Sequence, residues 1–430
     1  MSKSLMAALA LLACGGVCAE SPRSAIFLHP DGMGANTWAA LRLKEVGPDG
    51  RLNWDRLPRL AIYVGPMLDS VAASSNGGAT THAYGVRAAL ADFGMVGGKR
   101  PVAASGKAES VMHAARSAGK AIAIVNSSSI TEPGTAAFLA SVADRDNETE
   151  IAAQILAARP DVILGGGEMF MLPKGQKGRH GKGVREDGRN LIAEAAKAGY
   201  RVVYTREELR ATPLDGKPLL GVFAAEATFN EYDEAGLARR KLAAFQPQAP
   251  RFDEMLAVAL SRVRDAKNGF LIVANEEGTD NLSGENNAPA TLEAAAGADR
   301  AIGLALAEAN ANPALTVIVA SDSDNGGMNA TGDDLDELPR PLPKRMENGS
   351  PLDSDDGKPF QAAPDARGVR QPFYVTWASG DDMGGGTVAR GIGPGARFIE
   401  GTIDSTVIYR ALYDGLFAEE PKAEPLPQSQ

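Results

Sequence analysis

Short apolar runs recur along the sequence, and most are followed by a segment with the periodicity of an α-helix. The apolar runs cover residues 25–28, 121–125, 162–164, 201–204, 219–224, 270–274, 315–320 and 372–377. The helical segments cover residues 109–118, 148–158, 190–198, 252–265 and 288–309. Strands that alternate with helices form a mostly parallel central sheet with helices on both faces. The sequence therefore predicts an α/β fold in which reactive side chains follow the carboxyl ends of strands.

The first 19 residues have the features of a secretion signal. Lys3 supplies the positive start, residues 5–13 are apolar, and residues 17–19 suit cleavage before Glu20. The apolar run is too short to span a bilayer, so no membrane span is expected. These features predict a periplasmic or secreted protein with one mature domain over residues 20–430. Cys14 ends a pattern that resembles a lipoprotein box, so lipidation of Cys14 is the alternative to simple cleavage.

Two segments of the mature chain lack the alternation of strands and helices. Residues 329–370 are rich in Asp, Pro and Gly and have no hydrophobic periodicity. We therefore expect a lid or loop excursion outside the sheet there. The tail, residues 417–430, is expected to be frayed because most of it is rich in Pro, Glu and Gln.

The charge of the chain limits the classes of partner. The formal charge is −10 at pH 7, whereas a nucleic-acid-binding protein needs a basic face. Nucleic acid is therefore not expected as a partner. A phosphate ester is still possible as a substrate, because bound cations can reverse the local charge of a site.

Acidic side chains follow four of the predicted strands. They come shortly after the apolar runs that end at residues 28, 274, 320 and 377, and they are Asp31, Glu277, Asp322 and Asp382. Crowded carboxylates are costly unless a cation or solvent offsets their charge. One such residue is commonly a turn or helix cap. Four of them indicate a cation site at one edge of the sheet.

Two further residues suit the handling of a phosphoryl group. Ser75 precedes a run of small residues that can begin a helix, and the positive end of a helix dipole favours an anion. Taken alone, a plain N-cap is the alternative for this serine. Arg145 has a guanidinium group that can bind two phosphate oxygens at once, and a surface ion pair is the alternative role.

Short motifs recur in an order that resembles the alkaline phosphatase family. They are Asp31-Gly32-Met33-Gly34 and the segments 77–87, 131–145, 161–167, 187–189, 220–223, 277–280 and 393–396. Each motif is weak by itself, but eight in one order are specific. The resemblance runs from about residue 24 to residue 416, so it implies a single catalytic domain with the fold of that family.

The resemblance also implies an activity and a set of site residues. It implies metal-dependent hydrolysis of small phosphate monoesters through a phosphoserine intermediate. Ser75 matches the nucleophile, with Ser70 as a rival, and Arg145 matches the arginine that binds phosphate. Metal ligands fall at or near Asp31, Glu132, Glu277, Asp280, Asp322 and Asp382. By analogy the protein is expected to form a homodimer. Phosphodiester or sulfate-ester hydrolysis, or binding without turnover, are the alternatives.

The sequence departs from the family pattern at the histidines. The family surrounds two zinc ions with three histidines, and the matching positions here are Gly284 or Glu285, Ser323 and Asp382. A site that keeps carboxylates but loses imidazoles suits magnesium, calcium or manganese better than zinc. The sequence therefore predicts divalent cations, with magnesium favoured over the zinc that the family implies.

Other departures lie near the same motifs. Gly134 stands where a threonine ligand of magnesium is expected, and Thr135 is adjacent to it. Ser74 stands where the family has an aspartate before its nucleophile. The chain has four histidines, of which His29 and His82 lie within the site motifs. Metal ligation and simple packing are both open for these two residues.

Overall fold

The computed structural model describes residues 22–333 and 335–421. The predicted signal peptide, Cys14 and the last nine residues of the predicted tail therefore lie outside the described residues. The tail residue Glu420 lies inside them and forms ion pairs with Arg397 and Arg410. Within the described chain, no helix is both long and apolar enough to cross a membrane.

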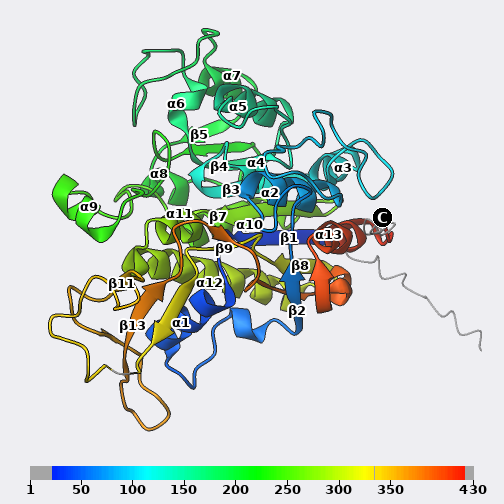
Figure 1. The fold of residues 1–430 in the computed structure, drawn as a ribbon. Coiled ribbons are helices and arrows are strands. Elements are labelled where there is room, and N and C mark those ends of the chain that lie inside the picture. Colours follow the sequence, from blue (N-terminus) through cyan, green and yellow to red (C-terminus); the bar gives the residue numbers. More distant parts are fainter. Residues whose placement is uncertain (1–21, 334, 422–430) are drawn as a thin grey trace, which may run out of the picture.

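A ten-stranded sheet runs through the middle of the molecule (Figure 1). Its strand order is β16-β2-β15-β8-β1-β7-β3-β4-β6-β5. The pairings are parallel except those of β15 with β2 and with β8. The strands are β1 (Ser24–Pro30), β2 (Arg59–Val64), β3 (Ala121–Ser129), β4 (Val162–Gly166), β5 (Arg201–Val203), β6 (Leu219–Val222), β7 (Phe270–Glu276), β8 (Leu315–Val319), β15 (Val388–Ile392) and β16 (Glu400–Asp404). The predicted α/β fold with a mostly parallel central sheet is confirmed.

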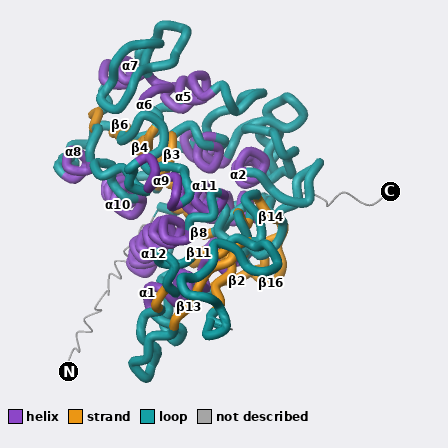
Figure 2. Tube along the Cα trace, turned by 60° about the vertical axis from the view of Figure 1, so that its left-hand side comes forward, coloured by secondary structure: helices purple, strands orange, loops and turns teal. Residues whose placement is uncertain are grey.

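Helices cover both faces of this sheet because its central strands are apolar on both sides. In β1, Ala25 and Phe27 pack into one core, and Ile26 and Leu28 pack into the other. The first core includes α2 (Ser75–Tyr84), α3 (Val111–Ser117), α5 (Glu148–Ala157), α7 (Leu191–Lys197) and α13 (Val407–Phe417). The second includes α1 (Ala35–Val46), α10 (Phe252–Val263) and α12 (Ala288–Ala311). Figure 2 shows α10, α12 and α1 along one side of the molecule and α2 on the other.

Shorter elements complete the chain. The short helices are α4 (Pro133–Ala136), α6 (Glu168–Met171), α8 (Arg206–Arg210), α9 (Glu234–Arg240), α11 (Gly278–Gly284), η1 (Trp54–Arg56) and η2 (Pro394–Phe398). A small antiparallel sheet contains β10 (Met328–Thr331), β11 (Leu352–Asp353), β12 (Phe360–Gln361) and β13 (Pro372–Trp377). A two-stranded ribbon pairs β9 (Asp324–Asn325) with β14 (Asp382–Met383). The small sheet and α5–α7 lie at opposite ends of the molecule (Figure 1).

The apolar run 372–377 does not join the main sheet, contrary to the prediction. It forms β13, the central strand of the small sheet, which is built largely from the predicted excursion 329–370. Phe373 and Val375 pack into a core of the main domain, whereas Tyr374 packs on Leu335 and Leu352 of the excursion. This strand is apolar because both of its faces are covered. A short apolar run in the sequence indicates a buried strand but does not reveal which sheet that strand joins.

Candidate active site

Four adjacent strands bring the predicted acidic residues to one edge of the sheet. The strands lie in the order β8, β1, β7 and β3, and all three pairings between them are parallel. Their carboxyl ends are followed by Asp322, Asp31, Glu277 and Glu132, respectively. Because parallel strands end at the same edge, residues from distant parts of the chain meet there. Asp280 joins them from the first turn of α11.

The glycine after Asp31 lets the neighbouring loops approach closely. Gly32 has φ of +59°, a conformation that glycine adopts without strain. A Cβ atom at this position would lie 2.3 Å from Asp280 Oδ1. The backbone N–H of Gly32 donates to Asp31 Oδ1 over 3.0 Å. Gly32 therefore both orients Asp31 and leaves room for Asp280 beside it.

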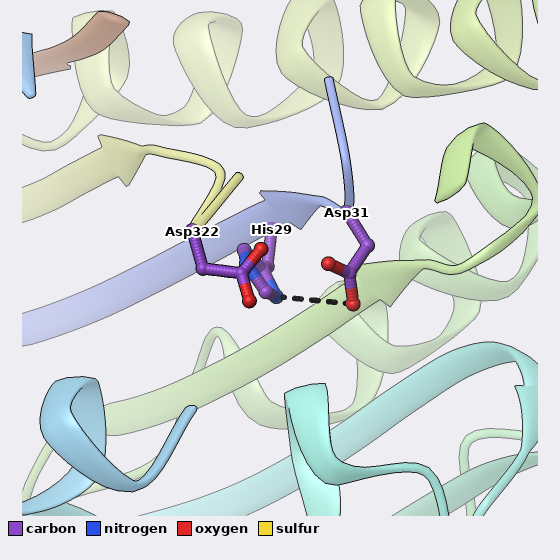
Figure 3. Close-up of side chains that lie close together, drawn as sticks. All are labelled: His29, Asp31 and Asp322. Atoms are coloured by element: carbon purple, nitrogen blue, oxygen red, sulfur yellow. Dashed lines mark ion pairs between the residues drawn. The ribbon is translucent and has the colours of Figure 1, made fainter. Parts of the chain in front are cut away.

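Asp31, Asp322 and His29 form a buried cluster at the centre of this edge (Figure 3). One oxygen of each carboxylate and one ring nitrogen lie within 4.8 Å of one another. His29 and Asp31 are 0% exposed, and Asp322 is 3% exposed. Groups that bind a metal through oxygen or nitrogen need this convergence.

Burial, and then mutual repulsion, raise the pKa values of most carboxyls in the site. Burial, and then the charges of Asp322, Glu277 and Asp280, raise the pKa of Asp31 well above its usual value. Burial and neighbouring carboxylates act in the same direction on Glu277 and Asp280, raising the pKa of each. Burial, and then Asp322, raise the pKa of Asp382 to about 6.

Asp322 is the exception among the site carboxyls. Burial opposes its ionisation, but the interaction of its charge with the neighbouring His29 holds the pKa of Asp322 below the usual range. The other carboxyls repel one another, so the site lacks enough positive charge to neutralise them when they ionise.

Several polar atoms at this edge have no hydrogen-bond partner in the described chain. They include Asp31 Oδ2, both carboxylate oxygens of Asp322, Asn275 Oδ1 and Asn325 Oδ1. Buried polar atoms are rarely left unpaired. Unpaired carboxylate and amide oxygens at one place are the donor set that a divalent cation takes. The residues present therefore fit such a cation.

Asp382 reaches the site by a route that the sequence did not predict. It lies in β14, which pairs with β9, and not after a strand of the main sheet. Its Oδ1 accepts a hydrogen bond from Ser323 Oγ over 2.6 Å. Asp280 Oδ1 in turn accepts from Asn325 Nδ2 over 2.8 Å. Ser323 and Asp382, which stand where histidines were expected, are therefore bonded to each other.

Helix α2 begins at Ser75 and packs on Asp322 through its first turn. Ser74 is the N-cap, because its Oγ accepts from the Gly77 N–H over 3.3 Å and donates to the Leu90 carbonyl over 2.5 Å. Ser75 is the first residue of the helix and is half-buried. A Cβ atom at Gly78 would lie 2.6 Å from Asp322, so the first turn of the helix packs directly on that carboxylate.

The rival nucleophile Ser70 lies in a turn before the helix. Its Oγ accepts from the Ala72 N–H over 3.2 Å, and its carbonyl accepts from the Met67 N–H over 2.9 Å. The preceding Asp69 accepts from the Leu90 N–H over 2.8 Å. These bonds close the loop before α2, and they give Ser70 a local structural role.

Arg145 and Glu132, predicted to bind phosphate and metal, form an ion pair of 3.0 Å with each other. Burial raises the pKa of Glu132 and the charge of Arg145 lowers it. Burial has the larger effect, so the pKa of Glu132 is raised. The neighbouring Thr135 is fully buried. Its hydroxyl accepts from Asn126 Nδ2 over 3.2 Å and donates to the Glu132 carbonyl over 3.5 Å. Thr135 is therefore engaged with the protein and not directed at the carboxylate cluster.

An acidic cavity of about 430 Å³ lies beside this ion pair. Its lining includes Glu132, Glu226, Glu231, Tyr232 and Asn281. Burial, and then Glu132 and Glu226, raise the pKa of the nearby Glu148 to about 8. The cavity thus continues the negative charge of the site outward from the sheet edge.

Two acidic residues near the motifs face away from the cluster. Glu276 Oε1 accepts from Ser127 Oγ over 2.6 Å and from the Gly278 N–H over 3.0 Å. Successive residues of a strand point to opposite faces, so Glu276 and Glu277 diverge. Asp324 packs against Gly34, where a Cβ atom would lie 2.3 Å from its Oδ1. Sequence reasoning missed Asn275 of β7 and Asn325 of β9, because an amide within a strand carries no distinctive signal.

We expect the metal-free protein to lose stability as pH rises from about 4 to 7. A carboxyl whose pKa is raised by folding stabilises the fold fully below its unfolded pKa and loses that contribution as pH rises through the folded pKa. The pKa is raised to about 6 for Asp382 and to about 7 for Glu276, in the latter case mainly by burial. The pKa of Asp322 is lowered, so its contribution to stability increases as pH rises. More of the site carboxyls have a raised pKa than a lowered one, so the net change is a loss of stability.

Thermal unfolding between pH 4 and 8, with a chelator or with a divalent cation, measures this effect. The cation binds the ionised carboxylates, so it should flatten the pH dependence. An identical pH dependence with and without the cation would contradict a cation site at this edge.

Comparisons with known proteins agree on one family. The family model described as alkaline phosphatase matches residues 23–348. An alkaline phosphatase of Gadus morhua is 30% identical over 332 residues, which cover 68% of this chain and 67% of that protein. A streptomycin-6-phosphate phosphatase of Streptomyces griseus is 29% identical over 347 residues, covering 70% and 73%. The tissue-nonspecific alkaline phosphatase of Homo sapiens is 28% identical, and the match spans 63% of its length.

Solved structures share the fold. The alkaline phosphatase of Thermus thermophilus superposes with a TM-score of 0.71 at 24% identity, covering 94% of this chain and 93% of that one. The alkaline phosphatase of the Antarctic bacterium TAB5 gives 0.68 at 17% identity, covering 93% and 100%. A variant of the TAB5 enzyme with bound Mg gives 0.67 at 18% identity, covering 92% and 98%.

Proposed function

Because the chain belongs to the alkaline phosphatase family, we propose that it hydrolyses phosphate monoesters through a phosphoserine at Ser75. Family membership supports a phosphatase enzyme, and the proposal adds the residues and the order of bond changes. The observation that carries it is the set of buried, unpaired carboxylates beside the first turn of α2. That arrangement combines a cation site with a hydroxyl at the positive end of a helix.

Divalent cations would be held at the sheet edge by the carboxylates of the cluster. Asp31 and Asp322 form its centre, Glu277 and Asp280 lie on the β7 side, and Asp382 lies on the ribbon side. Glu132 could contribute if its ion pair with Arg145 opens. When bound, the cations supply positive charge that lowers the pKa of a serine hydroxyl and offsets the charge of phosphoryl oxygens. Carboxylate and amide oxygens favour magnesium or manganese for this role.

The Ser75 hydroxyl gives its proton to solvent water, its Oγ attacks phosphorus, and the bond from phosphorus to the leaving oxygen breaks. The leaving oxygen takes a proton from water and departs as an alcohol. In the second half, a water molecule loses a proton to solvent as its oxygen attacks the phosphoserine, the bond from Oγ to phosphorus breaks, Oγ takes a proton from water, and inorganic phosphate leaves. Ser75 is available because Ser74 already caps the helix. The first backbone N–H groups of α2 can donate to phosphoryl oxygens, since helix N-termini bind anions.

Arg145 would bind the non-bridging oxygens of the phosphoryl group. One arm of its guanidinium contacts Glu132, which leaves further N–H donors of the fork for phosphate. Its side chain is 46% exposed, so it can move toward a bound substrate. The acidic cavity beside the Arg145–Glu132 pair is then the space for the leaving group.

Replacing Arg145 with alanine should raise KM for nitrophenyl phosphate and lower kcat, each by roughly 10-fold to 100-fold. The loss is partial because the cations still carry much of the charge stabilisation. The measurement is steady-state release of nitrophenol after dialysis against a chelator and addition of magnesium, manganese or calcium in turn.

Arg116→Ala is the matched control for this substitution. Arg116 pairs with Asp161 over 3.3 Å, and Asp161 comes just before β4, at the opposite edge of the sheet. Its removal should leave KM unchanged. The proposed function is wrong if the parent protein releases no nitrophenol with any of the three cations.

A further inference from the structure

His29 is fully buried, yet neither of its ring nitrogens has a hydrogen-bond partner among the described residues. A buried imidazole without a partner loses the hydrogen bonds that it makes in water. Its two nitrogens face Asp31 and Asp322, whose facing oxygens Asp31 Oδ2 and Asp322 Oδ1 are also unpaired. Three side chains therefore converge on one place (Figure 3), where His29 is within ion-pair distance of both aspartates but none of these atoms makes a hydrogen bond to another.

One ring nitrogen of His29 and one oxygen of each aspartate lie within 4.8 Å of one another, close enough to share an ion. His29 Nδ1 lies 3.8 Å from Asp31 Oδ2, and Nε2 lies 3.5 Å from Asp322 Oδ1. Both distances exceed those of a normal hydrogen bond. Ligands bound about 2.0–2.1 Å from a tetrahedral ion are roughly 3.3 Å apart. One ring nitrogen and one oxygen from each aspartate can thus share an ion after small rotations.

The fold fixes the position of the imidazole. His29 and Asp31 are two residues apart in and just after β1, so they point to the same face of the sheet. The His29 ring stacks on Phe27, with centroids 5.5 Å apart and an interplanar angle of 22°. Its other neighbour, His82 of α2, meets it edge-on at 5.5 Å. His82 is itself held by a 2.7 Å hydrogen bond between its Nε2 and the Tyr63 hydroxyl.

We propose that His29 is a nitrogen ligand of a transition-metal ion bound with Asp31 and Asp322. The inference deepens the proposed function, because it names the chemical class of one of its cations. An imidazole with two carboxylates suits zinc or manganese, whereas magnesium and calcium take oxygen ligands. The all-oxygen interpretation of the sequence then holds only for the outer carboxylates Asp280 and Asp382. His29 supplies from within the strand a nitrogen that Ser323 cannot supply from the loop.

Two measurements on the full-length mature protein test this proposal. After chelation, calorimetric titration with zinc chloride and with magnesium chloride compares the parent with His29→Gln. Loss of a direct ligand should weaken zinc binding by about 100-fold or more, with a much smaller change for magnesium. His180→Gln is the matched control, since the ring of His180 bonds to the Val222 carbonyl over 3.0 Å. That control should bind zinc like the parent.

Zinc-edge X-ray absorption of the parent protein does not depend on the folding of His29→Gln, and the same measurement on His82→Gln excludes the neighbouring ring of His82 as the source of the signal. Scattering from an imidazole ring on zinc is the expected result. A shell of oxygen atoms alone, or equal zinc affinity in His29→Gln, overturns the proposal. Cation-dependent turnover with either of those results would leave the proposed function standing. A zinc–imidazole signal without turnover would defeat the proposed function and support the His29 site.

Discussion

Replacing Ser75 with alanine is expected to abolish the phosphoenzyme and to lower turnover of nitrophenyl phosphate roughly 1,000-fold or more. The hydroxyl is the only group in the proposed reaction that forms a bond to phosphorus before water does. The effect should therefore be far larger than that of any residue that only binds phosphate.

The structure supports Ser75 over its neighbours by what each hydroxyl does. The Ser74 hydroxyl accepts a hydrogen bond from the Gly77 N–H and donates one to the Leu90 carbonyl. Ser70 accepts the Ala72 N–H in the preceding turn. Ser75 makes no hydrogen bond through its hydroxyl within the described chain, and it begins the helical turn that packs on Asp322.

Acid quenching during turnover, followed by mass spectrometry of the peptide that contains residues 70–75, measures the phosphoenzyme. Two variants serve as controls. Ser74→Ala should cost about 1 kcal/mol of stability through loss of the cap, with a modest effect on turnover. Ser70→Ala should leave a phosphorylated peptide. If Ser75→Ala keeps the parent's rate and Ser70→Ala loses it, Ser70 is the nucleophile.

The sequence predicted the central part of the fold because burial there is nearly complete. The strands β1, β3, β7 and β8 are buried on both faces, so each one is a continuous apolar run. Outer strands gave weaker signals. In β2, four of six residues are exposed, and β16 has a single buried residue. Their places in the sheet depend on partners distant in sequence, which local periodicity does not reveal.

The site was predictable to the extent that topology alone determines it. Acidic residues after adjacent parallel strands must meet, and Asp31, Glu277 and Asp322 do so. Which of two neighbouring carboxylates faces the site depends on the pleat, and Glu276 turned away. The role of His29 depends on a close approach of three side chains. A histidine inside an apolar strand gives no sign in the sequence that it points at carboxylates rather than into the core.

The second large effect is expected at Asp31, where replacement by asparagine should separate function from stability. Turnover should fall by roughly 1,000-fold, because the carboxylate at the centre of the cation site loses its charge. The metal-free variant should nevertheless unfold a few degrees above the metal-free parent at pH 8. Asp31 is fully buried among Asp322, Glu277 and Asp280, and their repulsion destabilises its ionised form.

Asparagine fits this position because it keeps the bonds that orient Asp31. The amide oxygen can still accept the Gly32 N–H, and the amide N–H₂ group can donate to Asp322. The stability gain should shrink as pH falls to about 5. The raised pKa means that Asp31 takes up a proton on folding, so the parent is already neutral there at low pH. Cation-induced stabilisation should be largely lost in the variant.

Glu276→Gln is the control that separates the effect of losing a cation ligand from the effect of neutralising any buried carboxylate. Its pKa is also raised, to about 7 and mainly by burial, but its carboxylate bonds to Ser127 on the other side of the strand. This substitution should raise the stability of the metal-free protein at pH 8 and leave cation binding and turnover intact. Unfolding temperatures with a chelator and with manganese, measured beside turnover, compare the two variants. If Asp31→Asn retains the parent's turnover and cation-induced stabilisation, Asp31 does not hold the cation and the site must be assigned to the outer carboxylates.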